Sequence, residues 1–370
     1  MRPSQAIVDL AALRRNLARA AACAPGANTI AVIKANGYGH GLVPVAQALA
    51  EAADALAIAT IDEALVLRDE GITAPLLVLQ GAHTPNDVAE AAERRLWLMA
   101  HSMDQVNALC RDRSGNPVTA WLKIDTGMHR LGIAPQDTAL ACKTLAAAAN
   151  VADPVVLCTH LACADETTNP ATPRQLEVFA ACTAGLDLPR SIANSAGILH
   201  WPQSHAEWNR PGIMLYGCDP AGAADGGEAG LEAVMRVTSE IIAIREVRPG
   251  EGVGYGQRWR AKEPARIGTV SIGYGDGYPR HAPDGTPVWI RARRVPFAVT
   301  VSMDMITLDL SGQDDIRVGD EVELWGPNLA VNEIAAHAGT IGYELLAGMT
   351  ARLPRVYLDG DREDRGQSQA

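Results

Sequence analysis

Residues that could do chemistry follow short apolar runs of this sequence, each within a few residues of the predicted end of a strand. They supply amines, guanidinium groups, an imidazole, an amide and a hydroxyl: Lys34, Lys123, Arg130, His160, Asn194, Ser195 and Arg210. In barrels of alternating strands and helices, reactive groups lie at the carboxyl ends of the strands. The spacing therefore predicts that these side chains share one rim.

Lys34 emerges from the apolar run 29–33 and is followed by glycines at positions 37, 39 and 41. A lysine at the end of a buried strand is partly desolvated, which lowers the pKa of its amine and frees it to form a Schiff base. Glycines let the backbone approach a ligand, and Tyr38 is placed to reach one. A solvated surface lysine is the alternative that the spacing alone leaves open.

Short apolar runs and Ala-rich helical stretches alternate through the first two-thirds of the chain. The predicted strands are 29–33, 55–59, 75–79, 96–99, 118–124, 155–159, 191–193 and a weaker 206–209, and the predicted helices are 42–53, 61–70, 85–94, 103–111, 136–149 and 174–185. Strands separated by single helices pair in parallel through right-handed crossovers. Eight such units predict an α/β fold with an N-terminal (β/α)8 TIM-like barrel rather than an open sheet.

After residue 218 the composition shifts to small and turn-forming residues, and we interpret 219–230 as a linker. β-type runs follow at 234–247, 265–272, 288–290, 297–310 and 321–324, with a helix at 331–338 and a last strand at 355–358. We therefore expect the barrel at 1–218, although its N-terminal strand could join the other domain, and a C-terminal mostly-β domain at 231–358. The polar tail 359–370 is expected to be disordered.

The composition excludes several classes of protein. The net charge of −11 argues against general binding to nucleic acid or anionic membranes, because both need a basic face. No run approaches the ~18 apolar residues that a membrane span requires, and the N-terminus has no signal-peptide core. The seven cysteines include no CxxC pair, which favours reduced core residues over disulfides or a metal site. We expect a cytoplasmic protein without a metal.

The string around Lys34 closely resembles the lysine motif of alanine racemases, enzymes of the fold-type III pyridoxal-phosphate class. Further strings agree with that family, in its order and almost from end to end. These strings are Ala31–Gly41, Ile7–Leu17, Lys123–Gly132, Thr159–Ala162, Asn194–Ala196, Arg210–Ile213, Gly273–Tyr278 and Ser302–Asp304. The resemblance implies an isomerase that interconverts L-alanine and D-alanine, and so forms D-alanine, through a pyridoxal-phosphate aldimine by two-base proton transfer.

The resemblance also implies how the barrel would hold the cofactor. Lys34 would carry pyridoxal phosphate as a Schiff base and act as one of two proton-transfer bases. The remaining cofactor-binding positions are Tyr38, His160, Asn194, Ser195, Arg210, Gly212, Ile213 and Tyr216. Tyr38, Ser195 and the backbone N–H groups of Gly212 and Ile213 would bind the phosphate, which barrels often hold after their last two strands. For Ser195, a helix N-cap is the structural alternative.

Three cationic side chains would tune the cofactor. Arg210 would face its pyridine nitrogen and, because an arginine stays protonated, would keep the ring a weaker electron sink, which favours racemisation over transamination. Arg130 would contact the phenolic oxygen and the substrate carboxylate. Lys123 matches a position that is often carbamylated in the family, and the resulting anion orients the arginine. His160 would pack on the ring and bond the catalytic tyrosine. An ordinary salt bridge at the rim is the alternative for Arg210, and a buried structural histidine is the alternative for His160.

Racemisation removes a proton from one face of a planar intermediate and returns one to the other, so a second base is needed. A free tyrosine has a pKa of ~10 and needs help to accept a proton. The resemblance implies that Tyr274, on a glycine-rich turn, is this base and comes from the other subunit of a homodimer with shared sites. Met303 and Asp304 would cross over with it to meet the substrate, and Tyr255 would line its entrance.

Two departures from the family pattern bear on substrate range. Ala351 stands where some members carry a second phosphate-binding tyrosine, and Val299-Thr300 replaces a common Gly-Arg. Both leave strict selectivity for alanine open, so a racemase of broader specificity, for serine or other small amino acids, is the nearest alternative. A fold-type III decarboxylase would not need Tyr274. A non-catalytic pyridoxal-phosphate-binding protein would not need the β-rich extension.

Overall fold

The computed structural model describes residues 2–112, 115–222, 230–298 and 301–360. It divides into two compact units. The barrel unit comprises Arg14–Gly37 and Leu42–Leu215, and the sheet unit comprises the chain up to Leu13, Tyr38–Gly41 and the chain from Tyr216 onward. The chain therefore leaves the barrel unit for four residues directly after the segment that carries Lys34.

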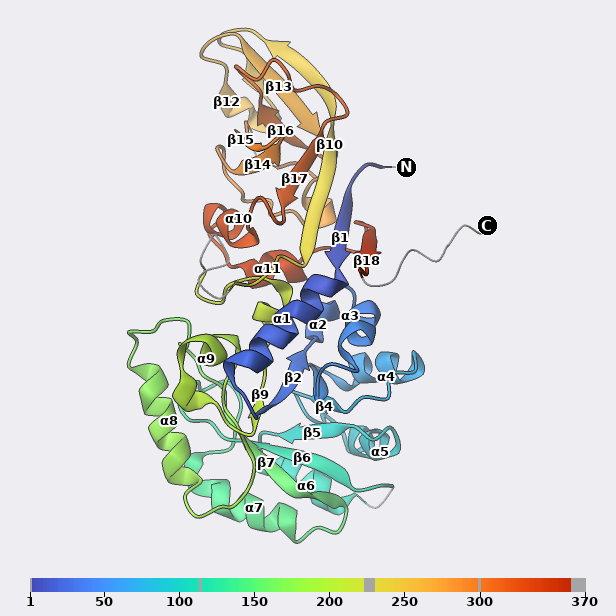
Figure 1. The fold of residues 1–370 in the computed structure, drawn as a ribbon, viewed down its shortest axis with the longest axis vertical. Helices are drawn as coiled ribbons and strands as arrows, with labels where there is room; N and C mark the ends of the chain where they lie inside the picture. The colour runs from blue at the N-terminus through green and yellow to red at the C-terminus, as the bar shows by residue number, and fades with distance from the viewer. Residues whose placement is uncertain (1, 113–114, 223–229, 299–300, 361–370) are drawn as a thin grey trace. The chain divides into compact units, whose positions relative to one another are not determined.

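Eight parallel strands form a closed barrel in the order β2 to β9, with helices around them (Figure 1). They are β2 (Asn28–Val32), β3 (Ala55–Ile58), β4 (Leu76–Val78), β5 (Trp97–Ala100), β6 (Val118–Lys123), β7 (Val151–Cys158), β8 (Arg190–Ser191) and β9 (Trp208–Asn209). β3 and β4 are buried along their whole length, as expected for parallel strands covered by helices. The barrel predicted from the sequence is confirmed, with each strand close to its predicted position.

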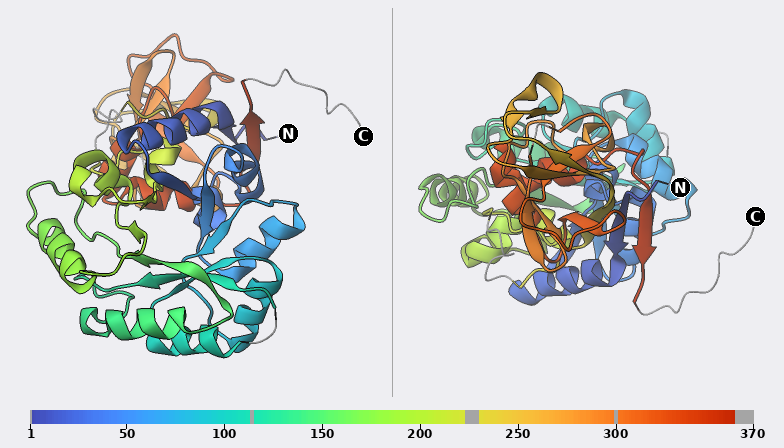
Figure 2. Two further views of the ribbon diagram at one scale, coloured as in Figure 1. Left: turned by 60° about the horizontal axis from the view of Figure 1, so that its bottom comes forward. Right: turned by 90° about the horizontal axis from the view of Figure 1, so that it is seen from above.

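The helices of this region are α1 (Leu10–Cys23), α2 (Lys34–Tyr38), α3 (Leu42–Leu49), α4 (Ile61–Asp69), α5 (Pro85–Glu93), α6 (Met103–Arg111), α7 (Thr138–Ala146), α8 (Ala171–Cys182) and α9 (Ser195–His200). Figure 2 shows α7 and α8, in green, outside the barrel strands. Side-chain caps set some of the starts: Thr84 forms a capping box with Asp87 at α5, and Ser102 caps α6. Such caps satisfy backbone N–H groups that have no partner within the helix.

The sheet unit is mostly β, which confirms the predicted fold class. Its main sheet runs β15-β14-β17-β10-β1-β18, with β13 on β10 and β16 on β13. The strands are β1 (Gln5–Asp9), β10 (Met235–Val247), β11 (Gly252–Val253), β12 (Trp259–Arg260), β13 (Ala265–Val270), β14 (Pro287–Ile290), β15 (Arg293–Pro296), β16 (Ile306–Asp309), β17 (Glu321–Trp325) and β18 (Arg355–Leu358). β1 pairs with β10 and β18, so the first strand of the chain belongs to this sheet.

Two details of the sheet unit differ from the sequence prediction. The run 297–310 is not one strand, because Ser302 closes a turn in which its N–H and hydroxyl both donate to the Met305 carbonyl, at 3.0 and 2.6 Å. Helix α10 (Val331–Ala338) has its predicted bounds, whereas α11 (Gly342–Ala347) was not predicted. Residues 223–229 of the predicted linker, Val299-Thr300 and 361–370 of the predicted tail lie outside the described residues.

Among the helices of the described residues, none is long and apolar enough to cross a membrane.

Candidate active site

The backbone after Lys34 adopts a left-handed turn. Ala35, Asn36, Gly37 and Tyr38 all have positive φ, between 50° and 61°, although only one of them is glycine. Left-handed backbone costs a residue with a Cβ about 1 kcal/mol or more, so a run of it persists only where surrounding contacts enforce it. Strain of this kind concentrates at functional sites, and here it directly follows the candidate nucleophile.

Glu63, in the first turn of α4, is one of the contacts that enforce this turn. Its carboxylate accepts the N–H of Ala35 at 2.7 Å and the N–H of Ala59 at 2.8 Å. One side chain thus joins the segment after Lys34 to the segment after β3. Asn36 adds a second link, because its side-chain oxygen accepts the Leu42 N–H at 2.9 Å.

The Lys34 amine lies in a cationic environment. Burial lowers its pKa most, and the guanidinium of Arg130 lowers it further. The Glu63 carboxylate opposes this shift, and Arg210 adds to it. A lysine whose pKa is lowered holds more of its amine unprotonated, which is the form that attacks a carbonyl.

Arg130 lies in a loop that directly follows β6 and is closed by an isolated bridge between Ile124 and Ile133. The Asp125 carboxylate organises this loop, accepting the N–H groups of Gly127 and His129, both at 3.0 Å. Gly132 lets the loop close, because a Cβ there would lie 2.4 Å from the Asp125 nitrogen. Arg130 itself is exposed, so an ordered loop carries its guanidinium at the surface.

Arg210 is buried just after β9 and ties several strand ends together. Its guanidinium donates to the Thr159 carbonyl at 2.6 Å, the Ile192 carbonyl at 3.3 Å, and the Ser191 hydroxyl. It also lies 3.5 Å from Nδ1 of His160. Burial lowers the pKa of Arg210, but a guanidinium remains protonated at any relevant pH.

His160 and Lys123 lie among the arginines of the rim. Burial holds the pKa of His160 well below its usual value, with Arg210, Lys123 and Arg130 adding to the effect. Burial likewise lowers the pKa of Lys123, the last residue of β6. The rim therefore favours a neutral imidazole and concentrates positive charge where an anion would be attracted.

Ser195 begins α9, but the helix cap is its neighbour. The Asn194 side chain accepts the Gly197 N–H at 3.0 Å, and its amide donates to the Leu161 carbonyl at 3.2 Å. The Ser195 hydroxyl instead accepts the N–H groups of Gly212 at 2.8 Å and Met214 at 3.4 Å. The N-cap interpretation of Ser195 is therefore wrong, and the hydroxyl joins the segments that follow β8 and β9.

Tyr38 and Tyr216 belong to the sheet unit. Their rings stack with centroids 4.7 Å apart, and the His40 ring lies 4.6 Å from Tyr216. Burial raises the pKa of Tyr38, so its phenol stays protonated and can donate. Arg355 fixes the next residue, donating to the Gly39 carbonyl at 2.7 Å.

Tyr274 lies on a turn that packs backbone to backbone against the Ser302–Met305 turn. The Tyr274 N–H donates to Ser302 O at 3.0 Å and the Gly275 N–H to Met303 O at 2.9 Å. Gly273 permits this approach, because a Cβ there would lie 2.2 Å from Ser302 O. The Tyr274 side chain is 38% exposed and that of Met303 is 52% exposed, so two large side chains face outward together.

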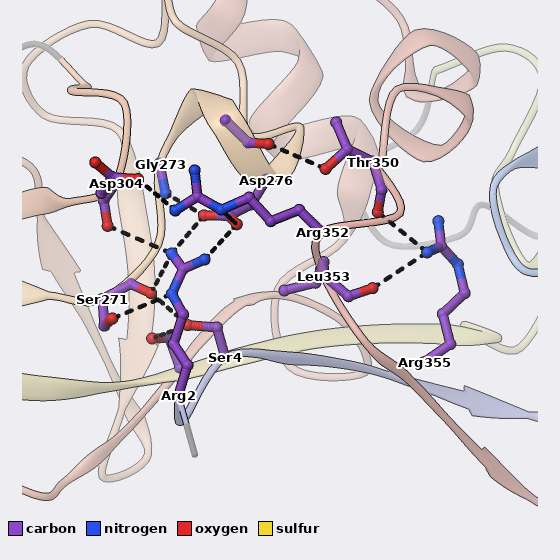
Figure 3. A network of polar contacts seen from close by, with 12 residues as sticks. Arg2, Ser4, Ser271, Gly273, Asp276, Asp304, Thr350, Arg352, Leu353 and Arg355 are labelled. Atoms are coloured by element: carbon purple, nitrogen blue, oxygen red, sulfur yellow. Dashed lines mark hydrogen bonds and ion pairs between the residues drawn. The ribbon is translucent and has the colours of Figure 1, made fainter.

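A buried carboxylate organises the Tyr274 turn, as Figure 3 shows. Asp276 accepts the Gly273 N–H at 2.9 Å and pairs with Arg2 at 2.5 Å and Arg352 at 3.3 Å. Arg352 also pairs with Asp304. Asp304 is thus already engaged within the sheet unit, together with the turn that carries Tyr274.

Tyr255 lies apart from these clusters, whereas Ala351 directly precedes Arg352, which pairs with Asp276. Tyr255 is 81% exposed on a short 3-10 helix, Tyr255–Gln257, and no described contact joins it to the Tyr274 turn. Ala351 is exposed in the segment that follows α11. Their roles at the substrate entrance stay predictions.

The structure adds contacts that the sequence reasoning did not single out. Glu63 stands three residues after Thr60, the spacing of a capping box, which could have drawn attention to it, although Thr60 makes no side-chain cap. No local sequence pattern predicts the ion pair between Arg2 and Asp276, because 274 positions separate the two residues. Only the folded sheet brings that pair together.

The fold and the rim define a class of protein. It is a (β/α)8 barrel enzyme followed by a β domain, in which the pKa of Lys34 is lowered by burial and by neighbouring arginines. A family model for the alanine racemase N-terminal domain matches residues 8–220, and one for the alanine racemase C-terminal domain matches residues 234–357. The chain therefore belongs to the alanine racemase family.

Individual relatives agree along the whole length. The chain is 46% identical to an alanine racemase of Chromohalobacter salexigens over 360 residues, 97% of this chain and 99% of that protein. A biosynthetic alanine racemase from Pseudomonas aeruginosa superposes with a TM-score of 0.93 at 46% identity, covering 97% of this chain and 100% of that one. An alanine racemase from Bacillus anthracis with bound L-Ala-P gives a TM-score of 0.85 at 31% identity, covering 98% and 96%.

Proposed function

We propose that this protein is a pyridoxal-phosphate-dependent racemase that interconverts L-alanine and D-alanine. The observation that carries the proposal is the Lys34 amine, held with a lowered pKa beside Arg130 and Arg210, on a chain that matches alanine racemases over both domains. The family is pyridoxal-phosphate-dependent, and its members act on an amino acid whose side chain is one methyl group. A cytoplasmic location stays a prediction.

The donor set of the barrel rim fits pyridoxal phosphate. The cofactor is an anion with a reactive aldehyde, and the rim offers an amine whose pKa is lowered, with Arg130, Arg210 and Lys123 around it. Ser195, with the nearby backbone N–H groups of Gly212 and Ile213, would hold the phosphate, joined by the Tyr38 phenol. The Gly212 N–H donates to the Ser195 hydroxyl at 2.8 Å, so these two groups lie next to each other.

When bound, pyridoxal phosphate supplies an electron sink that makes the α-proton of an amino acid acidic. Lys34 would hold the cofactor through its amine and move a proton at Nζ on one face of the substrate. Arg130 would bind the substrate carboxylate, for which a guanidinium is well suited. Arg210 would face the ring nitrogen, where its permanent charge limits electron withdrawal and so limits side reactions.

Tyr274 would move a proton at its phenolic oxygen on the opposite face, with His160 as its exchange partner. Since it belongs to the sheet unit, with Met303 and Asp304 beside it, we propose that a second copy of the chain supplies all three residues in a homodimer with two shared sites. The exposed Tyr274 and Met303 side chains support this, because they lie on adjoining turns and are open to contact from a partner.

Two further assignments belong to the same proposal. A carbamate on Lys123 would replace one cation of the rim with an anion that can orient Arg130, and the lowered pKa of Lys123 leaves more of its amine free to react with carbon dioxide. Tyr255 would narrow the entrance toward a methyl side chain. A racemase of broader specificity is the second candidate, favoured by the small, exposed Ala351.

The test is to incubate the purified protein with pyridoxal phosphate and each L-amino acid and to quantify D-enantiomers by chiral chromatography. We expect D-alanine to form fastest and to approach an equal mixture from either side. Equal rates with serine would favour the broader racemase. Carbon dioxide with the matching amine would indicate a decarboxylase, and no turnover of any amino acid would contradict the proposal.

A further inference from the structure

We infer that Arg2, Asp276 and Arg352 are positioning residues that set the place of the Tyr274 phenol. The inference deepens the proposed function and depends on it, because it assigns the groups that hold the second base. We call these residues, with Asp304, the Asp276 network (Figure 3). None of its members is proposed to bind the cofactor. Arg2 lies near the start of the sequence, far from Tyr274.

The contacts of Asp276 show why the network fixes the turn. Its side chain is 0% exposed, and Oδ2 accepts the Gly273 N–H at 2.9 Å, which spans the residues on either side of Tyr274. Arg2 meets both oxygens, at 2.5 and 2.6 Å. A buried carboxylate without such partners carries a large desolvation cost. The two arginines offset this cost and so allow the Asp276 carboxylate to be buried against the Gly273 N–H.

Arg2 and Arg352 also fix the neighbouring strand and turn. The Arg2 guanidinium donates to the Ser271 carbonyl at 2.8 Å, at the end of the segment that leads into Tyr274. Arg352 pairs with Asp304 in the Met303 turn. The two arginines share the Asp276 carboxylate, and each also holds one of the two backbone segments that meet at Tyr274.

The segment after α11 supports the same turn from another side. The Thr350 hydroxyl donates to the Gly275 carbonyl at 3.0 Å, and its N–H donates to the Asp276 carbonyl at 3.1 Å. Arg355 in turn donates to the Thr350 carbonyl at 3.1 Å. Replacing Arg2 removes its contacts with the Asp276 carboxylate and the Ser271 carbonyl. The hydrogen bonds from Thr350 to the turn involve other residues and remain.

A two-base racemase makes this role measurable. In deuterium oxide, inversion of alanine needs both bases, whereas exchange of the α-proton with retained configuration needs only the base on one face. Lys34 lies in the barrel unit and has none of its described contacts in the Asp276 network. Displacing Tyr274 should therefore slow inversion and leave single-face exchange of one enantiomer intact.

The experiment compares Arg2→Ala with the unaltered holoenzyme, carrying the purification tag at the C-terminus. Inversion is followed by chiral chromatography and retained-configuration deuteration by mass spectrometry. We expect inversion to fall by about 100-fold, as for a displacement on the order of 1 Å, while exchange of one enantiomer changes by less than about twofold. Arg2→Lys, which keeps one charged contact, should recover most of the inversion rate, and Tyr274→Phe should match the pattern of Arg2→Ala.

Arg236→Gln is the matched control. It removes an arginine that pairs at 3.0 Å with Glu323, another nearly buried carboxylate of the sheet unit, without touching the Tyr274 turn. We expect both rates to stay within about twofold of the unaltered enzyme, since ion-pair losses elsewhere act on stability alone. If Arg2→Ala does not fold, Arg352→Gln decides by the same ratio of rates.

Two results would overturn the inference: inversion and exchange that fall by the same factor, or inversion that does not fall in any variant of the network. Either would leave the proposed racemase intact, because the unaltered enzyme would still invert alanine. If the unaltered holoenzyme neither inverts alanine nor exchanges its α-proton, the proposed function fails and this inference fails with it.

Discussion

The barrel rim and the Tyr274 turn reach reactivity by different physical means. At the rim, burial and crowded cations lower the pKa of Lys34, Lys123 and His160. At the turn, every described charge of the Asp276 network is balanced by a partner, and Tyr274 is left 38% exposed. The positive charge of the rim suits an anionic ligand. The turn is held rigidly and leaves Tyr274 open to contact from another surface.

Under the proposed function, the rim depends on a bound cofactor and the Tyr274 turn depends on a second copy of the chain. Positive charge at the rim raises the cost of folding until an anion such as a phosphate occupies it. The turn is held by contacts within one chain. We therefore expect cofactor to change the stability of the rim and dimerisation to change the reactivity of the turn.

Replacing Lys34 should have the largest effect. We expect Lys34→Ala to lower racemisation by at least about 1,000-fold, because both the covalent attachment of the cofactor and one base are lost. The visible absorbance of the attached cofactor should disappear as well, measured after gel filtration with equal protein. A variant that keeps both absorbance and turnover would remove the lysine from its assigned role.

Mixing two inactive variants tests whether the regions meet between chains. A hybrid of Lys34→Ala and Tyr274→Phe subunits has one site with both defects and one intact site if the sites are shared. Random mixing should therefore restore about a quarter of normal activity, since about half of the dimers are hybrids. Hybrid formation is checked by native mass spectrometry. Hybrids without activity would show that each site uses residues of a single chain.

The same contrast explains what the sequence could predict. Barrel strands alternate regularly with helices, and this regularity is enough to predict Lys34, Lys123, His160 and Arg210 on one rim, because each follows a strand of the same parallel barrel. The Tyr274 turn was located only through its resemblance to a known family. Its supports come from Arg2 and Arg352, and nothing local in the sequence tells which strand the first residues will join. Contacts between distant segments form only once the sheet does.

The run 297–310 illustrates the limit for secondary structure. Its apolar residues suit a strand, and β16 (Ile306–Asp309) is one, but Ser302 ends the extended backbone by bonding to the Met305 carbonyl. Such a turn depends on the fit of its neighbour, the Gly273–Tyr274 backbone, which propensity does not include. The left-handed turn after Lys34 has the same origin, because Glu63 enforces it from 28 positions away.

Acid should destabilise the rim through His160. Because burial and neighbouring cations lower the pKa of His160, the unfolded chain gains a proton near pH 6.5 that the folded chain does not take up, so stability falls as the pH drops below that value. We expect His160→Gln to reduce the stability lost between pH 7.5 and 5.5 by about 1 kcal/mol. Chemical denaturation of the cofactor-free protein, followed by circular dichroism, measures this difference. An unchanged pH dependence would contradict a neutral imidazole in the folded rim.

Ala351→Tyr should have the smallest effect. It tests whether a side chain at position 351, in the segment after α11, can bind the cofactor phosphate. Some family members are expected to bind the phosphate with a tyrosine at this position, and Ala351 is exposed, so a larger side chain can be added without creating overlap in a core. One added hydrogen bond should tighten cofactor binding by about 2- to 10-fold, measured by titration of intrinsic fluorescence. The ratio of serine to alanine turnover should fall as the entrance narrows. Unchanged affinity and selectivity would mean that Ala351 does not face the phosphate, and that any breadth of specificity has another cause.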